Sequence, residues 1–338
     1  MTAPLPKGFL LRPATGEDLP AVVVLFNACD RRFSGEDEHT EGGVRENWAT
    51  LGFDLARDAC VVLDPTGRLV GYEHVWDTAP PHVRLSLTGR VHPEAMGKGI
   101  GTALVRWGEA RASASVPLAP EGSRVVLRAT LFEQDGAGRT LLLAEEFVAV
   151  RHSFRMAVDF GGPPPPPALP EGIRVRPFAP GKDLEATVAA EGDAFRDHWG
   201  FVERPFAFKV EQWRRWMDTS SSFDPSLWFL ALDGERIAGL ILCQPSASDP
   251  ALAFVDTLAV RRPWRRHGLG LALLRHAFAE LYARGLRRAA LYVDARSLTG
   301  ATRLYERAGM TVERRFDTWE RGLRSGVDLT TQSTLPSD

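Results

Sequence analysis

The chain has 338 residues, of which 44% are hydrophobic and 25% charged, and 41 Lys and Arg oppose 43 Asp and Glu. This length predicts about two domains, and the composition is typical of globular proteins with packed cores. The near-neutral charge argues against nucleic acid as the main partner, and no apolar run approaches the 18 residues of a membrane span. The first residues lack the pattern of a secretion signal, so we expect a cytoplasmic protein.

Metal binding is not expected from the cysteines. Cys29, Cys60 and Cys243 are scattered through the chain and lack the paired spacing of a zinc site or a disulfide framework. We expect three reduced thiols in the core and no metal.

Gly161-Gly162 and the run Pro163 to Pro167 divide the chain. A run of prolines is stiff and extended, which predicts a spacer between domains; a proline-rich ligand for another protein is the alternative. We therefore expect a first domain over residues 1–160, a linker over 161–170, a second domain over 171–324 and a flexible tail over 325–338.

The two halves resemble each other in chain order, which indicates a tandem duplication. Three pairs of segments correspond: 6–19 with 170–184, 60–72 with 228–240, and 91–107 with 260–276. Each half is predicted to be α/β: a strand and helix, a hairpin with a glycine turn, a glycine-rich loop, a helix, another strand and a closing hairpin.

The most informative segment runs from Phe254 to Gly270. An apolar strand-like run is followed by a loop with four arginines, and then by Gly268-Leu269-Gly270 at the start of a helix predicted to stop at Gly285. Free backbone N–H groups at a helix N-terminus favour phosphate, and glycines let the backbone approach the anion without a Cβ. A structural turn with solvated arginines is the alternative.

This segment resembles a known signature. Arg265-x-x-Gly268-x-Gly270 is similar to the acetyl-CoA signature of GNAT-type N-acetyltransferases, and residues 290–310 resemble the next strand and helix of that family. Ser297 and Met310 stand where the family often has Asn and Phe. The resemblance implies two tandem GNAT-like domains, each with a mixed, mostly antiparallel twisted sheet flanked by helices.

The resemblance also implies acetyl-CoA as co-substrate. The strand backbone from Leu258 to Val260 would pair with the pantetheine arm and polarise the thioester, and the loop amides would bind the pyrophosphate, with charge added by Arg265 and Arg266. The expected cofactor-binding residues are Leu258, Ala259, Val260, Arg265, Arg266, His267, Gly268, Leu269, Gly270, Leu271 and Ser297.

Two residues are candidates for proton transfer. An amine acceptor must lose a proton to attack the thioester, and the leaving thiolate must gain one. By resemblance, Asp256 is the general-base candidate, directly or through water, and Tyr305 the general-acid candidate. The alternatives are a strand carboxylate paired with an arginine and a core tyrosine with a satisfied hydroxyl.

The first half lacks these groups. Leu87 matches Asp256 and Leu142 matches Tyr305, and neither leucine can transfer a proton. We expect catalysis in the second half and a degenerate first half. A second cofactor site is left open at Val91, Gly97, Lys98, Gly99, Ile100 and Gly101.

The acceptor region is expected at residues 190–217, which are rich in aromatics. His198 and Trp199 are the substrate-site candidates, with carboxylates such as Asp193 and Asp197 for a cationic amine. The alternative is that the aromatics are helix core and His198 is a satisfied histidine.

The predicted function is acetyl transfer to a primary amine of a small molecule, by a monomer or, as an alternative, a homodimer. The tandem layout is also similar to mycothiol synthase, which leaves open a cysteinyl pseudodisaccharide as acceptor. A non-catalytic CoA- or metabolite-binding regulator is the alternative of another class; retention of Asp256 and Tyr305 favours the enzyme.

Overall fold

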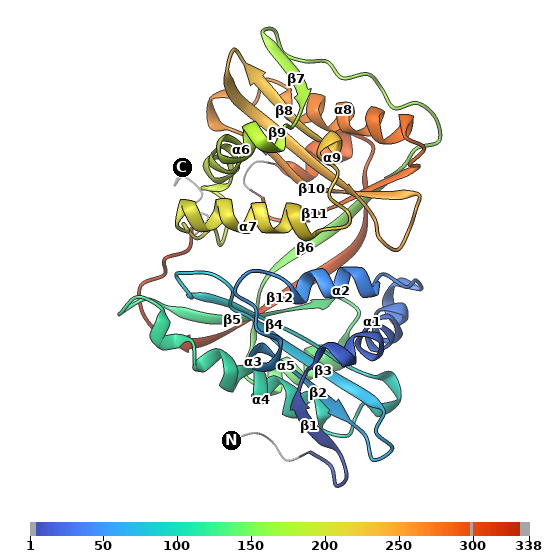
Figure 1. Ribbon diagram of the computed structural model, residues 1–338, viewed down its shortest axis with the longest axis vertical. Coiled ribbons are helices and arrows are strands. Elements are labelled where there is room, and N and C mark those ends of the chain that lie inside the picture. Colours follow the sequence, from blue (N-terminus) through green and yellow to red (C-terminus); the bar gives the residue numbers. More distant parts are fainter. Residues whose placement is uncertain (1–4, 298–299, 332–338) are drawn as a thin grey trace. The chain divides into compact units, whose positions relative to one another are not determined.

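The computed structural model describes residues 5–297 and 300–331, and the chain forms two compact units (Figure 1). The first unit contains the chain up to Arg151 together with Phe316–Leu329, and the second contains His152–Arg315 and the chain from Thr330. Within the described residues, every helix is too short or too polar to cross a membrane.

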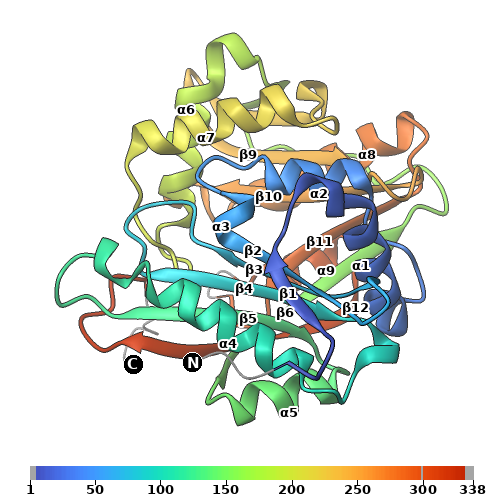
Figure 2. The same ribbon diagram turned by 60° about the horizontal axis from the view of Figure 1, so that its bottom comes forward.

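The first unit is a mixed sheet with helices on both faces. Its strands, in sheet order, are β1 (Leu10–Pro13), β2 (Ala59–Leu63), β3 (Leu69–Trp76), β4 (Arg84–Val91), β5 (Val125–Phe132) and the end of β12 (Thr311–Arg324). Only the β4–β5 pair is parallel. Its helices are α1 (Leu19–Ser34), α2 (Glu41–Trp48), α3 (Leu55–Asp58), α4 (Ile100–Ser113) and α5 (Gly136–Ala144). Helix α4 lies along β3 and β4 (Figure 2).

The second unit repeats this order. Its strands are β7 (Ile173–Pro177), β8 (Trp228–Asp233), β9 (Arg236–Pro245), β10 (Leu252–Val260), β11 (Arg288–Asp294) and β6 (Val148–Asp159), and only β10–β11 is parallel. Its helices are α6 (Pro180–Phe195), α7 (Phe206–Thr219), α8 (Leu269–Ala283) and α9 (Ala301–Arg307). The predicted α/β class with mostly antiparallel sheets is confirmed.

Alternation along the strands of the second unit separates two apolar cores. Ile241 and Val255 face α8 and α9, whereas Leu240 and Leu242 face α6 and α7. The residues at 240–242 therefore point to opposite faces in turn, and the functional side chains considered below can be assigned to one face or the other.

Strand exchange makes the units differ from the contiguous domains expected from the sequence. Strand β6 precedes the proline run, yet Ser153–Asp159 pairs with β11 of the second unit. Strand β12 belongs to the second half of the sequence, yet its end pairs with β5 of the first unit, from Phe316 opposite Phe132 onward. Each sheet is thus closed by a strand from the other half, and the linker does not coincide with the boundary between units.

The segment expected to be a flexible tail is hydrogen-bonded over its described part. The Val327 N–H donates to the Gly122 carbonyl of the first unit at 2.8 Å. Thr331 accepts from the Gly200 N–H and donates its own N–H to the Phe201 carbonyl, both at 2.8 Å. The loop between α6 and α7 is therefore tied to Thr331, while residues 332–338 lie outside the described part.

Candidate active site

The glycine-rich loop has the same backbone in both units. A short 3₁₀ turn, Arg262–Trp264, precedes it in the second unit, and Pro93–Ala95 does so in the first. Arg266 and Gly268 have φ values of 66° and 81°, and Gly97 and Gly99 have 75° and 81°. The alternation of left-handed and right-handed residues turns successive N–H groups toward one side, which forms an anion-binding concavity.

The amides at the start of α8 are available for such an anion. Gly268 is the N-cap, and the Ala272 N–H donating to the Gly268 carbonyl at 3.1 Å is the first bond of the helical type. The N–H groups of Leu269, Gly270 and Leu271 therefore have no acceptor within the helix. This is the position expected for a pyrophosphate group.

Gly270 has a packing role that the sequence did not indicate. A Cβ at this position would lie 3.1 Å from Leu304 of α9 and 3.8 Å from Val260, so it would point into the packing between α8 and α9. Gly101 is placed in the same way, 2.9 Å from Leu141 of α5. The expectation that this glycine makes room for the anion is corrected: its missing side chain permits close helix packing, and only its N–H faces a ligand site.

The guanidinium of Arg265 is also committed inside the protein. It donates to the Val260 carbonyl at 3.0 Å, to the Ala194 carbonyl at 2.7 Å and to both carboxylate oxygens of Asp197 at 2.5 and 3.2 Å. Its charge is balanced by Asp197, and its N–H groups hold the loop against the end of α6. The Arg265 side chain is therefore already engaged within the unit, whereas Arg266 is exposed and has no ion pair among the described residues, so Arg266 is the better candidate for added charge at the phosphate site.

These two arginines should respond differently to substitution. We expect Arg265→Gln to lower the free energy of unfolding by about 1–3 kcal/mol, because several hydrogen bonds are lost and Asp197 loses its main partner. Arg266→Gln should leave stability unchanged within about 0.5 kcal/mol and weaken acetyl-CoA binding. Urea denaturation and calorimetry on both variants check this. A loss of stability in Arg266→Gln equal to that in Arg265→Gln would contradict it.

The strand before the loop opens toward the cofactor position. Strands β10 and β11 pair only from Leu252 to Phe254, opposite Arg288 to Ala290. Beyond Phe254, β10 continues to pair with β9 as far as Val260, but its pairing with β11 has ended. Leu258–Val260 thus has one backbone edge directed into the gap between two separating strands, where an extended amide chain can pair.

Asp256 lies in a β-bulge at the start of this gap. Val255 is opposite Cys243 and Thr257 is opposite Leu242, so Asp256 is an extra residue without a partner in β9. Its side chain is exposed, yet the surrounding protein desolvates it and raises its pKa to about 7, opposed by a hydrogen bond from Gln244. A carboxyl group that titrates near neutrality can accept a proton from an amine.

Gln244 and Ser222 support this carboxylate and were not identified from the sequence. The Ser222 hydroxyl donates to Gln244 Oε1 at 3.2 Å, which leaves the amide NH₂ of Gln244 to donate to Asp256. Gln244 is opposite Phe254 on β9. The bulge determines which residue of β9 reaches Asp256, and no local motif marks it.

Tyr305 lies on the other face of the sheet. It belongs to the core formed by α8 and α9 with the sheet, is 8% exposed, and burial raises the pKa of its hydroxyl to about 12. Its neighbour Leu304 contacts the position of Gly270 at the start of α8. Asp256 and Tyr305 therefore lie on opposite faces of the sheet.

The acceptor region differs from expectation in its carboxylates. Asp193 pairs with Arg261 at 2.8 Å, and Asp197 is held by Arg265. These carboxylates balance cations of the same unit, so they are not reserved for an amine. Trp213 and Trp216 pack on Trp228 with ring centroids 5.5 and 5.7 Å apart, which places them in the core.

His198 and Trp199 lie in the loop between α6 and α7 that Thr331 holds. Burial lowers the pKa of His198, and its ring meets Phe195 edge-on with centroids 4.5 Å apart. Trp199 is half-buried. Ser297 lies in the loop after β11, where its N–H donates to the Asp294 carbonyl at 3.1 Å.

The first unit lacks the bulge. Strand β4 pairs with β3 without interruption, and Leu87 is opposite Val75. Leu87 packs against Gly108 of α4, as Val255 packs toward α8. The correspondence drawn from the sequence is therefore corrected: Leu87 occupies the place of Val255, and Asp256 is an insertion without a counterpart. The match of Leu142 with Tyr305 is supported, since each accepts the N–H five residues later.

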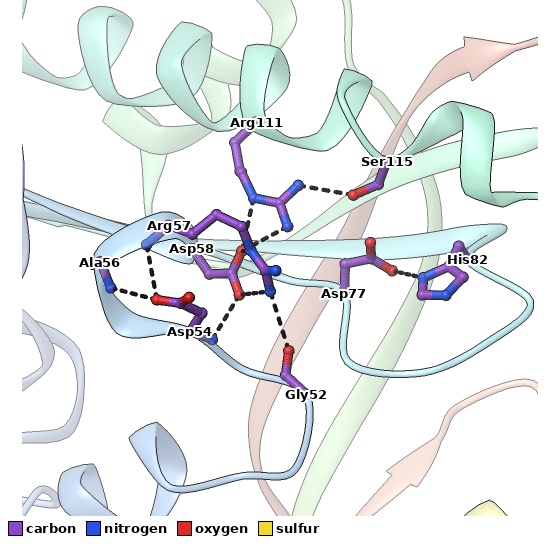
Figure 3. A network of polar contacts seen from close by, with 9 residues as sticks. All are labelled: Gly52, Asp54, Ala56, Arg57, Asp58, Asp77, His82, Arg111 and Ser115. Atoms are coloured by element: carbon purple, nitrogen blue, oxygen red, sulfur yellow. Dashed lines mark hydrogen bonds and ion pairs between the residues drawn. The ribbon is translucent and has the colours of Figure 1, made fainter.

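Buried polar residues of the first unit form structural networks. Asp58 accepts from Arg57 at 2.8 Å and from Nε of Arg111 at 2.7 Å, and Arg111 also donates to Ser115 (Figure 3). This network joins α3 to the end of α4. Among the described residues, no three His, Cys, Asp or Glu side chains are placed to hold a metal ion.

Comparison with known proteins defines the class. Residues 192–310 match the acetyltransferase (GNAT) family. A GCN5-related N-acetyltransferase from Sphaerobacter thermophilus has a similar structure, with 36% identity, a TM-score of 0.81, and coverage of 97% of this chain and 100% of that chain. A tandem GNAT protein from the clavulanic acid biosynthesis pathway shares the fold, with a TM-score of 0.69 at 16% identity over 94% of this chain and 99% of that chain. The chain is a GNAT N-acetyltransferase with a tandem architecture.

The names of individual relatives are more specific than the family description. A mycothiol acetyltransferase of Streptomyces scabiei is 35% identical over 278 residues, which are 79% of this chain and 78% of the relative. A mycothiol acetyltransferase of Thermobispora bispora is 31% identical over 252 residues, or 72% and 77% of the two chains. The chain thus belongs to the GNAT acetyltransferase family and has mycothiol acetyltransferases among its homologues.

Proposed function

We propose that the second unit transfers an acetyl group from acetyl-CoA to a primary amine of a small molecule. The observation that carries this proposal is the bulge residue Asp256, whose pKa of about 7 suits a general base and which has no counterpart in the first unit. The open edge of β10 leads from Asp256 to the free amides of α8, so one extended ligand can reach both.

Each step of acetyl transfer is then assigned to a backbone or side-chain group of the second unit. The amides of Leu269–Leu271 hold the pyrophosphate, and the backbone of Leu258–Val260 aligns the thioester. Asp256 takes a proton from the ammonium group, and the neutral nitrogen attacks the thioester carbon. The C–S bond breaks, and the departing sulfur takes a proton from the Tyr305 hydroxyl, which its raised pKa keeps protonated at neutral pH. The acetylated nitrogen then gives up its surplus proton, which restores the Tyr305 hydroxyl, and Asp256 releases its proton to solvent.

The relatives also suggest which molecule carries the acceptor amine. Their name supports the alternative in which the amine belongs to the cysteinyl pseudodisaccharide that precedes mycothiol. Family membership favours turnover over a regulator that only binds CoA. The first unit retains the loop, with Lys98 between Gly97 and Gly99, which supports a second CoA-binding site without Asp256 or Tyr305 equivalents.

Paired substitutions in the two glycine-rich loops test whether catalysis belongs to the second unit and only CoA binding to the first. Gly268 and Gly99 have the same φ of 81°, and a Cβ at either position meets nothing within 4 Å. Asparagine tolerates this left-handed conformation, so Gly268→Asn controls for strain, whereas Gly268→Asp adds a negative charge beside the loop amides. We expect Gly268→Asp to weaken acetyl-CoA binding about 100-fold relative to Gly268→Asn and to abolish turnover.

The matched pair Gly99→Asp and Gly99→Asn should leave turnover intact. Calorimetric titration with acetyl-CoA then reports whether the first unit contributes a second binding event that only Gly99→Asp removes. Loss of turnover in Gly99→Asp with an unaffected Gly268→Asp would move catalysis to the first unit and refute the proposal.

A further inference from the structure

Glu73 of the first unit is a buried carboxyl group that the proposed reaction does not use. It lies on β3, is 2% exposed, and its Oε1 has no hydrogen-bond partner among the described residues. Desolvation raises its pKa to about 8, opposed by the charge of Arg90 and by the backbone of His74, so the group is mainly uncharged at neutral pH. A buried polar atom without a partner is costly, which points to a ligand that completes the hydrogen bond.

The carboxyl group lies against β4 where that strand has an open edge. Glu73 is opposite Gly89, and a Cβ at Gly89 would lie 2.7 Å from the carboxyl carbon of Glu73 and 2.9 Å from its Oε1. The pairing of β4 with β5 ends two residues before Gly89, whereas β4 pairs with β3 as far as Val91. The Glu73 carboxyl therefore occupies the side-chain position of a residue on the open edge, which is the edge that Leu258–Val260 provides in the second unit.

The second unit shows that the fold does not require a carboxyl group at this place. The equivalent pair of β9 and β10 is Ile241 opposite Leu258, and both side chains pack in the core that the sheet forms with α8 and α9. The correspondence follows from Gly71 and Gly239, each of which lies opposite the last valine of the neighbouring strand. The first unit thus has a carboxyl group and a glycine in place of two apolar side chains.

Two carbonyl groups of the open segment are already used within the first unit. The Gly89 carbonyl accepts from Nη1 of Arg90 at 2.9 Å, and the Val91 carbonyl accepts from the Cys29 thiol at 3.2 Å. A ligand beside this segment therefore finds two acceptors engaged, whereas an uncharged Glu73 adds an O–H donor. A donor of this kind suits a carbonyl oxygen of the ligand.

We propose that Glu73 donates a hydrogen bond to the thioester carbonyl of an acyl-CoA bound in the first unit, and that this bond makes the unit prefer acyl-CoA over CoA derivatives without the carbonyl. This inference rests on the second CoA-binding site of the proposed function. The register of Gly89 corresponds to Leu258, the first residue of the segment proposed to align the thioester in the second unit. Because the first unit has no counterpart of Asp256, a thioester held there is bound without being transferred.

Binding to the first unit is tested in the Gly268→Asp variant, which disables the loop of the second unit. The probes are acetyl-CoA and S-ethyl-CoA, in which a methylene group replaces the carbonyl. Calorimetry should show acetyl-CoA binding about tenfold more tightly, the effect of one hydrogen bond. This preference should disappear when Glu73→Leu is added and persist with Glu73→Gln, which keeps an N–H donor.

Three results of this titration would overturn the inference: equal affinities for the two probes, an unchanged preference with Glu73→Leu, or no binding of either probe to the first unit. None of them depends on catalysis. Turnover of acetyl-CoA by the wild type is measured separately, so a failure of the proposed transfer reaction is distinguished from a failure of this inference.

The pH dependence of the preference gives a second readout. The groups that act on Glu73 are Arg90 of β4, Cys60 of β2 and Tyr72 of β3, and α4 turns Gly108 toward it. Burial raises the pKa of the Cys60 thiol and of the Tyr72 hydroxyl, which keeps both protonated. The preference for acetyl-CoA should fall as the pH rises from 7 to 9, since an ionised Glu73 has no proton to donate, and stay constant with Glu73→Gln. An equal fall with Glu73→Gln would assign the titration to another group and refute the role of Glu73.

Discussion

Replacing Asp256 by asparagine is expected to lower kcat/KM by about 10²- to 10⁴-fold, the range of a positioned general base. Asparagine keeps the size and the hydrogen bonding of the side chain toward Gln244 but cannot accept the proton of the amine. The affinity for acetyl-CoA should remain unchanged, because Asp256 precedes the backbone segment Leu258–Val260 that is proposed to hold the thioester. Steady-state kinetics combined with calorimetry separate these two quantities.

The pH dependence of the wild type identifies the same group. Desolvation by the surrounding protein raises the pKa of Asp256 to about 7, so the carboxylate that accepts a proton is lost as the pH falls through 7. We expect log kcat/KM to decline below that pH and the decline to vanish in Asp256→Asn. An unchanged acid limb in the variant would assign it to the acceptor amine or to another residue.

The stability of the folded protein should change with pH in the opposite direction to kcat/KM. The folded pKa of Asp256 lies above the ordinary value of 3.8, so the folded state holds a proton that the unfolded state has released, and stability falls as the pH rises from 3.8 through 7. An asparagine at this position has no proton to release, so the Asp256→Asn variant does not lose stability in this way as the pH rises. The midpoint of thermal unfolding of Asp256→Asn should therefore exceed that of the wild type at pH 8.5 and match it near pH 4, and equal midpoints at both pH values would argue against a desolvated carboxyl.

Local patterns predicted the two glycine-rich loops and the helices that follow them. The alternation of glycines before an amphipathic run indicated both loops, and their shared φ values follow from the same backbone requirement. The position of Tyr305 was predictable because its helix and the turn at Gly309 are a contiguous pattern, and the first unit adopts the same turn with Glu146 at a φ of 62°.

Features that depend on pairing between distant segments were not predictable. The bulge at Asp256 exists only in the register of β10 with β9, and for that reason Leu87 was matched with the wrong residue. The side chain of Arg265 turns toward Asp197, 68 residues earlier in the chain, which no local signal reveals. The exchange of β6 and β12 is likewise a property of tertiary pairing, which the sequence of neither strand indicates.

Replacing Tyr305 by phenylalanine is expected to lower kcat by about 10²-fold or more, within the range of general acid catalysis. The hydroxyl is kept in its protonated form by burial, with a pKa of about 12, so it can donate to a departing thiolate throughout the pH range of activity and should contribute no alkaline limb of its own. Removal of one hydroxyl group should change the free energy of unfolding by only about 1 kcal/mol. Acetyl-CoA affinity should persist, which distinguishes a lost proton donor from a damaged site.

The leaving group distinguishes general acid catalysis from a packing role of Tyr305. A selenol is far more acidic than a thiol, so an acetyl selenoester of CoA releases an anion that needs no proton at neutral pH. The rate of Tyr305→Phe should approach that of the wild type with this donor, whereas a variant that misplaces the cofactor would remain slow with both. If the deficit of Tyr305→Phe is the same for thioester and selenoester, the hydroxyl does not protonate the sulfur, and Tyr305 is one more residue of the core between α8, α9 and the sheet.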